Sequence, residues 1–424
     1  MRLKKASTIV QSGSIMSAMI DRPLYRCAWQ QLSEFKAMVF LAGPRQAGKT
    51  TFAQALMAGR DGVYFNYDIP EHRTRLIKNP AFYHDVTRTR EDRPFVVLDE
   101  IHKLPKWKNF LKGVYDRDKE QFSFLILGSG RLDVFRRGGD SLAGRYLLFH
   151  LWPFTLAELA NQRRSLQDFI ENPLAMPVGG AQEAAEQIWV DLRQYSGFPE
   201  PYVRKSAAFR AAWSMTYHRQ IIHDDIREQF AVLKAGEMTL LLDLIPLKVG
   251  SPVAMDNLAG DLHIAPDTVK NWLRLFDAFY LVFAIRPWTQ KVSRAITKMP
   301  KLYFFDYVRV EDPGARFENM VALELYRAVQ TWTDLGQGPF SLHYLRNREK
   351  QEVDFLVGRS GKPFLLVECK RTDSQISPSL LKFQQTLNVP AVQLVENMEG
   401  YKRIETAGQP LLVASACQWL SQLP

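Results

Sequence analysis

Residues 43–50 constrain the fold of this chain more than any other stretch of its sequence. They read GPRQAGKT, which is G-x-x-x-x-G-K-T, and they follow the apolar run Met38–Ala42. A short apolar run of this kind is typical of a buried parallel strand. Glycines at positions 43 and 48 allow backbone amides to turn inward around a phosphate chain, where a Cβ atom would collide. The next residues are helix-forming, so a positive helix N-terminus faces the phosphates. The sequence therefore predicts a strand, a phosphate-binding loop and a helix.

The side chains of this loop indicate a nucleoside triphosphate and a magnesium ion as ligands. Lys49 supplies a positive charge to the β- and γ-phosphates, and the Thr50 hydroxyl is a ligand for Mg²⁺. We expect ATP to be bound by the loop and its neighbours, namely Gly43, Pro44, Arg45, Gln46, Ala47, Gly48, Lys49, Thr50, Thr51 and Ser129.

A second apolar run supplies the acidic residues that such a loop requires. Residues 95–98 end in Asp99 and Glu100. Asp99 is placed to hold Mg²⁺ through water, and Glu100 is placed to orient or deprotonate the attacking water. A glycine-rich turn before a helix explains the first motif alone, but it does not explain both motifs together. We therefore expect ATP and Mg²⁺ as cofactors, with Lys49 and Glu100 as catalytic residues of ATP hydrolysis.

Apolar runs and helical segments alternate over the first 155 residues. Strands are expected at 38–42, 63–67, 95–98, 122–127 and 146–151, after a leader and a helix near 26–35. This alternation predicts a parallel sheet with helices on both faces and ligands at the carboxyl ends of the strands. Ser129, just after the fourth strand, is a candidate sensor of the γ-phosphate, and a plain turn residue is the alternative.

A glycine-containing loop between the last two strands is rich in arginine, with Arg131, Arg136, Arg137 and Arg145. Beside a nucleotide, such a loop can supply an arginine finger, either to its own site or to that of a neighbouring subunit. Arg145 is the candidate for this catalytic role, and a solvated basic surface loop is the alternative. An arginine that acts on a neighbour requires an oligomer.

Length, charge and cysteine usage set broader limits. A chain of 424 residues is too long for one ordinary core and suggests two or three domains. The net charge of +10 suits a polyanionic partner, although many proteins without one are equally basic. The cysteines Cys27, Cys369 and Cys417 show neither a disulfide framework nor a zinc spacing, which fits the cytoplasm. No apolar run approaches about 18 residues, so we expect no membrane span.

Two regions follow the expected ATPase core, a helical region at 156–235 and a compact module at 236–310. The module has helices at 237–244, 255–262 and 267–279, and Asp267 is placed to cap the last of them. Apolar runs at 281–285 and 301–305 then form a ribbon. Helix, turn, helix and ribbon predict a winged helix-turn-helix.

This module offers basic and polar side chains to DNA. Its second helix would enter the major groove and its wing would lie near phosphate. The alternative is a contact between domains or subunits. The candidate contacts are Lys270, Asn271 and Arg274 on the helix and Lys291, Arg294 and Lys298 on the wing.

Carboxylates and a lysine come together again in residues 311–424. Glu318 opens a helix at 317–330, and strands are expected at 342–346, 352–357 and 364–370. Glu368 and Lys370 are two apart on a strand, so both project from one face, and Asp354 on the neighbouring strand can join them. Glu318, Asp354 and Glu368 are candidate ligands of one or two Mg²⁺ ions, and Lys370 is a candidate to activate water. A salt-bridged pair of adjacent strands is the alternative.

Several blocks carry a family resemblance that covers residues from about 20 to 400. GPRQAGKTT, VVLDEIHKLPKWKNFLKGVYD, LGSG, DSLAGR and LWPFTLAEL resemble prokaryotic AAA-type ATPases related to the archaeal ATPase and STAND branches. These proteins carry a winged helix and a C-terminal PD-(D/E)xK domain, which is restriction-endonuclease-like. The later blocks GFPEPYV, IIHDDI, ENMVALEL, EVDFLV and VECK fit the same group.

The resemblance implies ATP binding by the loop glycines with Lys49, Thr50 and Thr51, and linkage to Mg²⁺ through Asp99 and Glu100. Two positions depart from the family pattern. Val353 stands where the nuclease motif has proline, which only shapes the strand end. Gly130 stands where the group often has a second hydroxyl residue, which argues against a sensor role there.

The expected fold is α/β, with a P-loop NTPase parallel sheet, a helical and winged helix-turn-helix region, and an α/β restriction-endonuclease-like domain. The expected domains are 1–155, 156–235, 236–310 and 311–424. The first functional hypothesis is a Mg²⁺-dependent ATPase that acts as a nucleotide switch coupled to DNA or a protein. The second is an ATP-gated, metal-dependent DNA endonuclease. The third is a DNA-binding regulator that responds to nucleotide without enzymatic activity.

Overall fold

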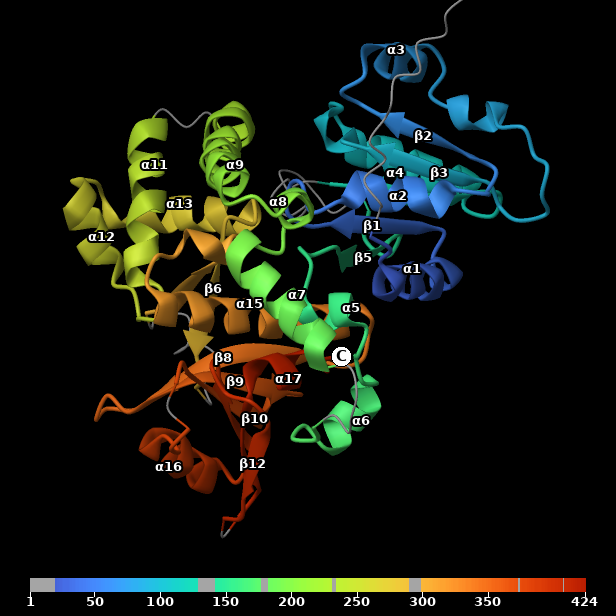
Figure 1. Ribbon diagram of the computed structural model, residues 1–424. Helices are drawn as coiled ribbons and strands as arrows, with labels where there is room; N and C mark the ends of the chain where they lie inside the picture. The colour runs from blue at the N-terminus through green and yellow to red at the C-terminus, as the bar shows by residue number, and fades with distance from the viewer. Residues whose placement is uncertain are drawn as a thin grey trace, which may run out of the picture.

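The computed structural model describes seven segments of the chain, which are residues 20–128, 142–176, 182–230, 234–289, 299–372, 374–406 and 408–424. Figure 1 shows a sheet with its helices at the N-terminal end, a group of helices in the middle, and a second sheet towards the C-terminus. Some residues singled out in the sequence lie outside the described segments, namely Ser129, Gly130, Arg131, Arg136, Arg137, Lys291, Arg294 and Lys298.

The N-terminal sheet has five parallel strands in the order β2-β3-β4-β1-β5. This arrangement confirms the predicted parallel sheet. Each strand lies within one or two residues of its expected position because apolar runs specify strands buried on both faces. The strands are β1 (Met38–Ala42), β2 (Gly62–Asn66), β3 (Phe95–Asp99), β4 (Ser123–Leu127) and β5 (Leu147–His150).

Alternate residues of each strand face different helical layers. Val39 and Leu41 of β1 share a core with α1 (Pro23–Phe35) and α2 (Lys49–Met57). Met38 and Phe40 face the opposite layer. That layer contains α3 (Pro70–Lys78), the 3-10 helix η1 (Phe82–Asp85) and α4 (Trp107–Asp118). The core on the α1 side continues into the middle helices and the C-terminal sheet, so the parts of the molecule share one apolar interior.

One 3-10 helix follows β3, and a series of helices after β5 forms the middle of the molecule. Many begin at a serine, threonine or proline, as expected from capping and from the fixed φ of proline. They are η2 (Ile101–Lys103), α5 (Leu156–Ala160), α6 (Leu166–Glu171), α7 (Gln182–Tyr195), α8 (Pro199–Arg204), α9 (Ala207–Gln220), the π-helix η3 (Ile221–Ile226) and α10 (Arg227–Phe230).

The elements of the expected winged helix occur in the expected order. These are α11 (Ala235–Leu244), η4 (Ile245–Lys248), α12 (Met255–Leu262), α13 (Pro266–Ala278), β6 (Val282–Pro287) and β7 (Lys301–Phe304). Strands β6 and β7 pair antiparallel. Helix α13 buries Val269, Trp272, Leu273 and Phe276, which is the apolar face read from the sequence. The assignment as a winged helix stays a prediction.

The expected cap of α13 was wrong. The helix begins one residue earlier, with Ala265 as its N-cap residue and without a side-chain cap hydrogen bond. Pro266 occupies the first turn, where its fixed φ suits a helix start and its missing N–H costs nothing. Asp267 therefore lies in the first turn, where its carboxylate complements the helix dipole.

The C-terminal sheet has eight strands in the order β12-β13-β11-β10-β9-β8-β6-β7. Strand β6 pairs with β8 through Arg286 and Pro287, so the β6–β7 ribbon and the C-terminal strands form one sheet. This sheet crosses the domain boundary expected near residue 310. Its remaining elements are η5 (Tyr307–Arg309), α15 (Pro313–Asp334), β8 (Phe340–Arg346), β9 (Glu352–Arg359), β10 (Lys362–Lys370), α16 (Pro378–Leu387), β11 (Ala391–Val395), β12 (Tyr401–Ile404), β13 (Leu411–Ser415) and α17 (Ala416–Leu420).

Helix α15 lies between the middle helices and the C-terminal sheet (Figure 1). It begins at Pro313, and the Asp312 side chain caps it by accepting a hydrogen bond from the amide of Ala315 at 2.7 Å. Glu318 was expected to open this helix and instead lies in its second turn. The cap at Asp312 explains the earlier start. Within the described residues, no helix combines the length and the apolar character needed to cross a membrane.

Candidate functional site

The phosphate-binding loop lies between β1 and α2, as the motif predicts. Gly43 has a φ of 143°, and a Cβ atom there would lie 2.2 Å from the carbonyl oxygen of Leu151. Gly48 has a φ of 94° and is the N-cap residue of α2. Both motif glycines are therefore required by backbone conformation, and Gly43 also by the close approach of a neighbouring strand end.

Lys49 is held inside this loop. Its side chain is buried, and its ammonium donates hydrogen bonds to the carbonyl oxygens of Gly43 at 2.9 Å and Pro44 at 2.7 Å. Burial lowers the pKa of Lys49 to about 8, against the opposing attraction of the Glu100 and Asp99 carboxylates. A cation held by neutral carbonyls keeps its charge available for an anionic ligand.

Thr50 and Asp99 meet at the carboxyl end of β3. The Thr50 hydroxyl donates to Oδ2 of Asp99 at 2.8 Å, and the Tyr64 hydroxyl donates to the same oxygen at 2.7 Å. Burial raises the pKa of Asp99. A cation bound beside it would lower this pKa again and favour the ionised carboxylate. A hydroxyl and a carboxylate side by side at a phosphate-binding loop fit a Mg²⁺ ion bound with a nucleotide.

Glu100 follows directly and has a φ of 52°, in the left-handed region. Its carboxylate lies 3.5 Å from Nε2 of His102 and 3.5 Å from Nζ of Lys103. Burial lowers the pKa of His102 to about 4, so that ring is neutral at physiological pH. The Glu100 carboxylate favours the charged forms of Lys49 and Arg45 in the neighbouring loop, since its charge acts to raise the pKa of each.

Side chains from the middle helices contact the loop, and the sequence motifs did not reveal them. Arg45 forms an ion pair with Asp225 of η3, with 2.6 Å from its Nη1 to each carboxylate oxygen. Oε1 of Gln46 accepts a hydrogen bond from the indole of Trp213 at 2.5 Å. The Tyr217 hydroxyl donates to the backbone oxygen of Arg45 at 3.3 Å. Asp225 lies in the block IIHDDI, but nothing local in that block indicates its partner.

A buried arginine supports the loop from the other side. Arg22, just before α1, donates to the carbonyl oxygen of Ala47 at 3.2 Å and to that of Trp152 at 2.8 Å. Its guanidinium also forms a buried ion pair with Glu158 of α5 at 2.7 Å. The loop is thus fixed at Ala47 by a charged group that the sequence analysis did not identify.

Arg145 forms an ion pair with helix α4, which packs against the first sheet. Its guanidinium forms an ion pair with Asp116 of α4 at 2.7 Å and 3.1 Å. The structure thus gives Arg145 a partner other than the phosphate-binding loop. Its role as an arginine finger stays a prediction.

The C-terminal cluster contains the predicted residues and several more. Nζ of Lys370 lies 2.9 Å from Oε1 of Glu368, and the amide of Cys369 donates to Oδ2 of Asp354 at 2.9 Å. Strands β9 and β10 therefore bring Asp354, Glu368 and Lys370 together as their spacing indicates. Glu318 approaches from α15, and the Tyr303 hydroxyl donates to its Oε1 at 2.7 Å.

Lys301 was not expected in this cluster. Its side chain is fully buried, and its ammonium contacts Glu318 at 3.1 Å, Glu352 at 2.6 Å and Asp354 at 3.6 Å. In the part of the chain that the structure describes, no three His, Cys, Asp or Glu side chains are arranged to hold a metal ion. Lys301 thus lies among the carboxylates predicted to bind Mg²⁺, and the role of Glu318, Asp354 and Glu368 as metal ligands stays a prediction.

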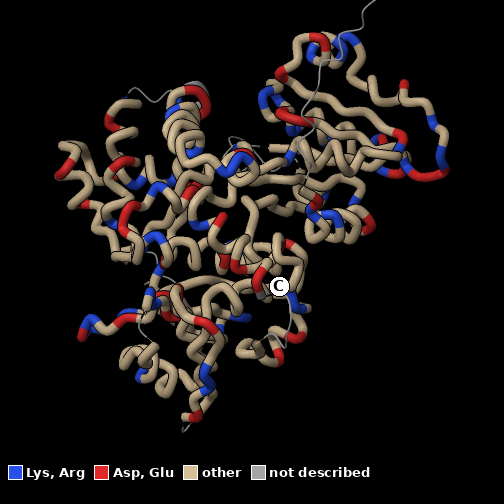
Figure 2. Tube along the Cα trace, in the orientation of Figure 1, with Lys and Arg blue, Asp and Glu red and all other residues tan. Residues whose placement is uncertain are grey.

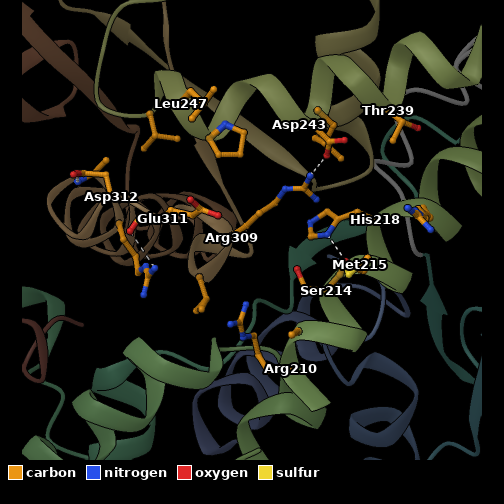
Figure 3. A pocket seen from close by; sticks show the side chains of 18 of the residues that line it. Arg210, Ser214, Met215, His218, Thr239, Asp243, Leu247, Arg309, Glu311 and Asp312 are labelled. Atoms are coloured by element: carbon orange, nitrogen blue, oxygen red, sulfur yellow. Dashed lines mark hydrogen bonds and ion pairs between the residues drawn. The ribbon is translucent and has the colours of Figure 1, made fainter. Parts of the chain in front are cut away.

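Helix α9 borders both the phosphate-binding loop and a large cavity. The cavity has a volume of about 800 Å³ and lies between α9, α11, η4, η5 and α15. Ser214 and His218 point towards it (Figure 3). The ion pair between Arg309 and Asp243 joins η5 to α11 beside them. Trp213, which contacts the loop, is the neighbour of Ser214 on this helix, so a shift of α9 would change both places.

Charged side chains of both signs are interspersed along the trace in each part of the molecule (Figure 2). On α13, the candidate DNA contacts Lys270, Asn271 and Arg274 are all exposed. Lys270 also contacts Asp267 one turn away at 3.0 Å. The helix thus presents these side chains to solvent, which is necessary for their expected role.

Three family models match successive parts of the chain. Residues 35–160 match an AAA domain, residues 186–307 match a domain of unknown function (DUF8612), and residues 313–411 match another (DUF4143). The first of these matches contains the phosphate-binding loop and the Asp99–Glu100 pair. The chain therefore carries an ATP-binding P-loop domain of the AAA type.

Curated relatives cover most of the chain. An uncharacterized protein of Mycobacterium tuberculosis, Rv2008c, is 24% identical over 352 residues, which are 80% of this chain and 71% of that protein. An uncharacterized protein of Methanocaldococcus jannaschii, MJ1637, is 22% identical over 326 residues, 69% of this chain and 68% of that protein. Among solved structures, the Walker-type ATPase of Pyrococcus abyssi is similar at 14% identity with a TM-score of 0.43, covering 70% of this chain and 96% of that one.

Proposed function

We propose that this protein is a Mg²⁺-dependent ATPase that works as a nucleotide switch in the cytoplasm. One observation carries the proposal. Lys49, Thr50 and Asp99, which are predicted to bind ATP and Mg²⁺, lie together. The same loop contacts the middle helices through Arg45 and Asp225 at 2.6 Å. ATP chemistry and the position of the middle helices are therefore linked at a single loop.

Each residue of the site has a defined task in ATP turnover. The ammonium of Lys49 exchanges the carbonyl oxygens of the loop for the β- and γ-phosphates. Thr50 and Asp99 would hold a Mg²⁺ ion, which would neutralise negative charge on the phosphates. Glu100 accepts the proton of the attacking water.

The switch follows from the charges that meet at Arg45. A bound triphosphate adds negative charge beside Glu100 and Asp225, which already repel each other. Arg45 is attracted to the phosphates as well as to Asp225, so the ion pair between them weakens. We expect η3 and α9 to shift when this ion pair weakens. Asp225 lies on η3, and Trp213 of α9 donates a hydrogen bond to Gln46, the loop residue next to Arg45. The shift reaches the cavity beside His218 and the elements that follow it.

DNA or a protein is the partner that this movement would control. The exposed face of α13 and the net charge of +10 support a nucleic acid as the first choice. A metal-dependent endonuclease finds less support, because Lys301 lies among the carboxylates that would bind the metal. A regulator that binds ATP without hydrolysing it would use the same nucleotide site, but Glu100 would not act there as a catalytic base.

The test measures ATP binding and turnover of the wild type and of Glu100→Gln, each with and without plasmid DNA. We expect Glu100→Gln to bind ATP as tightly as the wild type and to hydrolyse it about 100-fold or more slowly, the usual range for loss of a general base. The exposed carboxylate Glu120, in the turn before β4, provides the matched control Glu120→Gln, which should leave turnover unchanged.

Unchanged turnover in Glu100→Gln would remove Glu100 as the base. ATP binding at wild-type affinity in Lys49→Ala would refute the site itself. Turnover that rises with DNA would identify DNA as the partner, whereas turnover that ignores DNA would direct the search to a protein.

A further inference from the structure

The side chain of Lys301 lies at the centre of the C-terminal carboxylate cluster. Lys301 is the first residue of β7, and its side chain has no exposed surface. Its ammonium lies 2.6 Å from Oε1 of Glu352, 3.1 Å from Oε1 of Glu318 and 3.6 Å from Oδ1 of Asp354. A single buried cation thus faces three carboxylates from two different elements.

The surrounding backbone fixes these carboxylates and closes the site. Glu352 and Asp354 are two apart on β9, so their side chains share one face of the strand. Tyr303 shares a face of β7 with Lys301 in the same way and donates to Glu318. Gly250 also packs closely against Glu318, because a Cβ atom there would come within 2.8 Å of Oε2.

The remaining charges of the cluster are also paired. Lys370 contacts Glu368 at 2.9 Å, and Arg346 contacts Glu352 at 2.8 Å. The basic side chains therefore come from three elements, and each lies against a carboxylate. The cluster is largely neutralised by residues of the chain itself.

We propose that the ammonium of Lys301 is the resident cation of this cluster and occupies the place of a divalent metal ion. A Mg²⁺ ion requires oxygen ligands at about 2.0–2.1 Å. An ion bound to Glu318 and Asp354 would then lie within a few ångströms of a buried ammonium, and the two positive charges repel. The C-terminal domain thus keeps its carboxylates but binds no metal through them.

The same ion pairs give the cluster a mechanical role. Lys301 lies on the ribbon of the expected winged helix, whereas its partners lie on α15 and β9. Its backbone also bridges to Pro252, which precedes α12. The ammonium therefore fastens the ribbon to the C-terminal domain.

The experiment is a Mn²⁺ titration of the full-length, nucleotide-free protein, followed by electron paramagnetic resonance of the free ion. We expect the wild type and Asp354→Asn to give the same curve. Lys301→Met should gain one saturable Mn²⁺ site, with an affinity at least tenfold higher than that of the wild type for Mn²⁺. The double variant Lys301→Met with Asp354→Asn should lose this site again. Lys402→Met, which removes an exposed lysine on β12, is the control and should match the wild type.

Two results would overturn the proposal. The first is a Mn²⁺ site in the wild type that disappears in Asp354→Asn, because the ammonium would then not exclude the metal. The second is a folded Lys301→Met protein without a new site, because Lys301 would then not occupy the position of a metal. If that variant does not fold, Lys301→Met with Glu352→Gln removes one charge of each sign and replaces it in the titration.

Discussion

The two buried lysines Lys49 and Lys301 are held by opposite kinds of groups. Lys49 donates to two neutral carbonyl oxygens of its own loop, and burial lowers its pKa to about 8. Lys301 contacts three carboxylates, which raise its pKa despite its burial. A buried cation held by neutral groups can exchange them for an anionic ligand. A buried cation already paired with carboxylates has its charge satisfied and serves the fold.

The largest expected effect is a difference in the free energy of unfolding between variants of the two lysines. Lys301→Ala leaves three partly buried carboxylates without their buried cation. Removing one partner of a buried ion pair destabilises a protein by about 3–5 kcal/mol. Lys49→Ala should change the free energy of unfolding by less than about 1 kcal/mol, because the loss of its hydrogen bonds is offset by relief of the desolvation cost that lowers its pKa. Urea unfolding of both variants measures the difference. Equal losses would contradict the comparison.

ATP affinity should separate the lysines in the opposite direction. Lys49→Met loses charge-assisted hydrogen bonds to the phosphates, which are worth about 1.5–3 kcal/mol each. We expect at least a tenfold loss of ATP affinity by calorimetry. Lys301→Met should bind ATP like the wild type, and a matching loss there would mean that the two sites are coupled.

The pH dependence of ATP binding sharpens the role of Lys49. Its folded pKa of about 8 means that the free loop carries the ammonium below pH 8 and loses it as the pH rises. Bound phosphates favour the charged form, so ATP affinity should fall above pH 8 by up to about tenfold per pH unit. Lys49→Met should show no such fall. A wild-type affinity that is constant from pH 7 to pH 10 would refute this prediction.

The smallest expected effect tests the link between the loop and the middle helices. Asp225→Asn removes a carboxylate beside the phosphates and weakens the ion pair with Arg45. Since Asp225 is only partly buried, we expect ATP affinity to rise by a few-fold, which corresponds to about 1 kcal/mol or less. Amide exchange in α9 should also become faster in the absence of ATP. Asp224→Asn changes the exposed neighbour and is the control. Weaker ATP binding in Asp225→Asn would show that Asp225 positions Arg45 for the nucleotide.

The sequence predicted the features that depend on local patterns. The apolar runs, the loop motif and the spacing of Glu368 and Lys370 are all readable over a few residues, and the structure contains them. The ion pair between Arg45 and Asp225 and the contact between Lys301 and Asp354 join residues far apart in the chain. A lysine at the start of a strand ordinarily lies at the surface, so nothing in the sequence indicates that Lys301 is buried. The start of α15 at Pro313 was missed because Asp312 also fits an ordinary loop.

The continuous apolar core has a consequence for how the protein unfolds. Trp152 at the end of the first sheet stacks on Phe305, which in turn packs against Tyr326 of α15. These aromatic contacts lie in the interior that joins the ATP-binding sheet to the C-terminal sheet. Heating should therefore melt both sheets in one cooperative transition instead of one after the other. A chain cut near residue 310 would expose Phe305 and its neighbours to water, so we expect it to aggregate although its ATP-binding residues are all present.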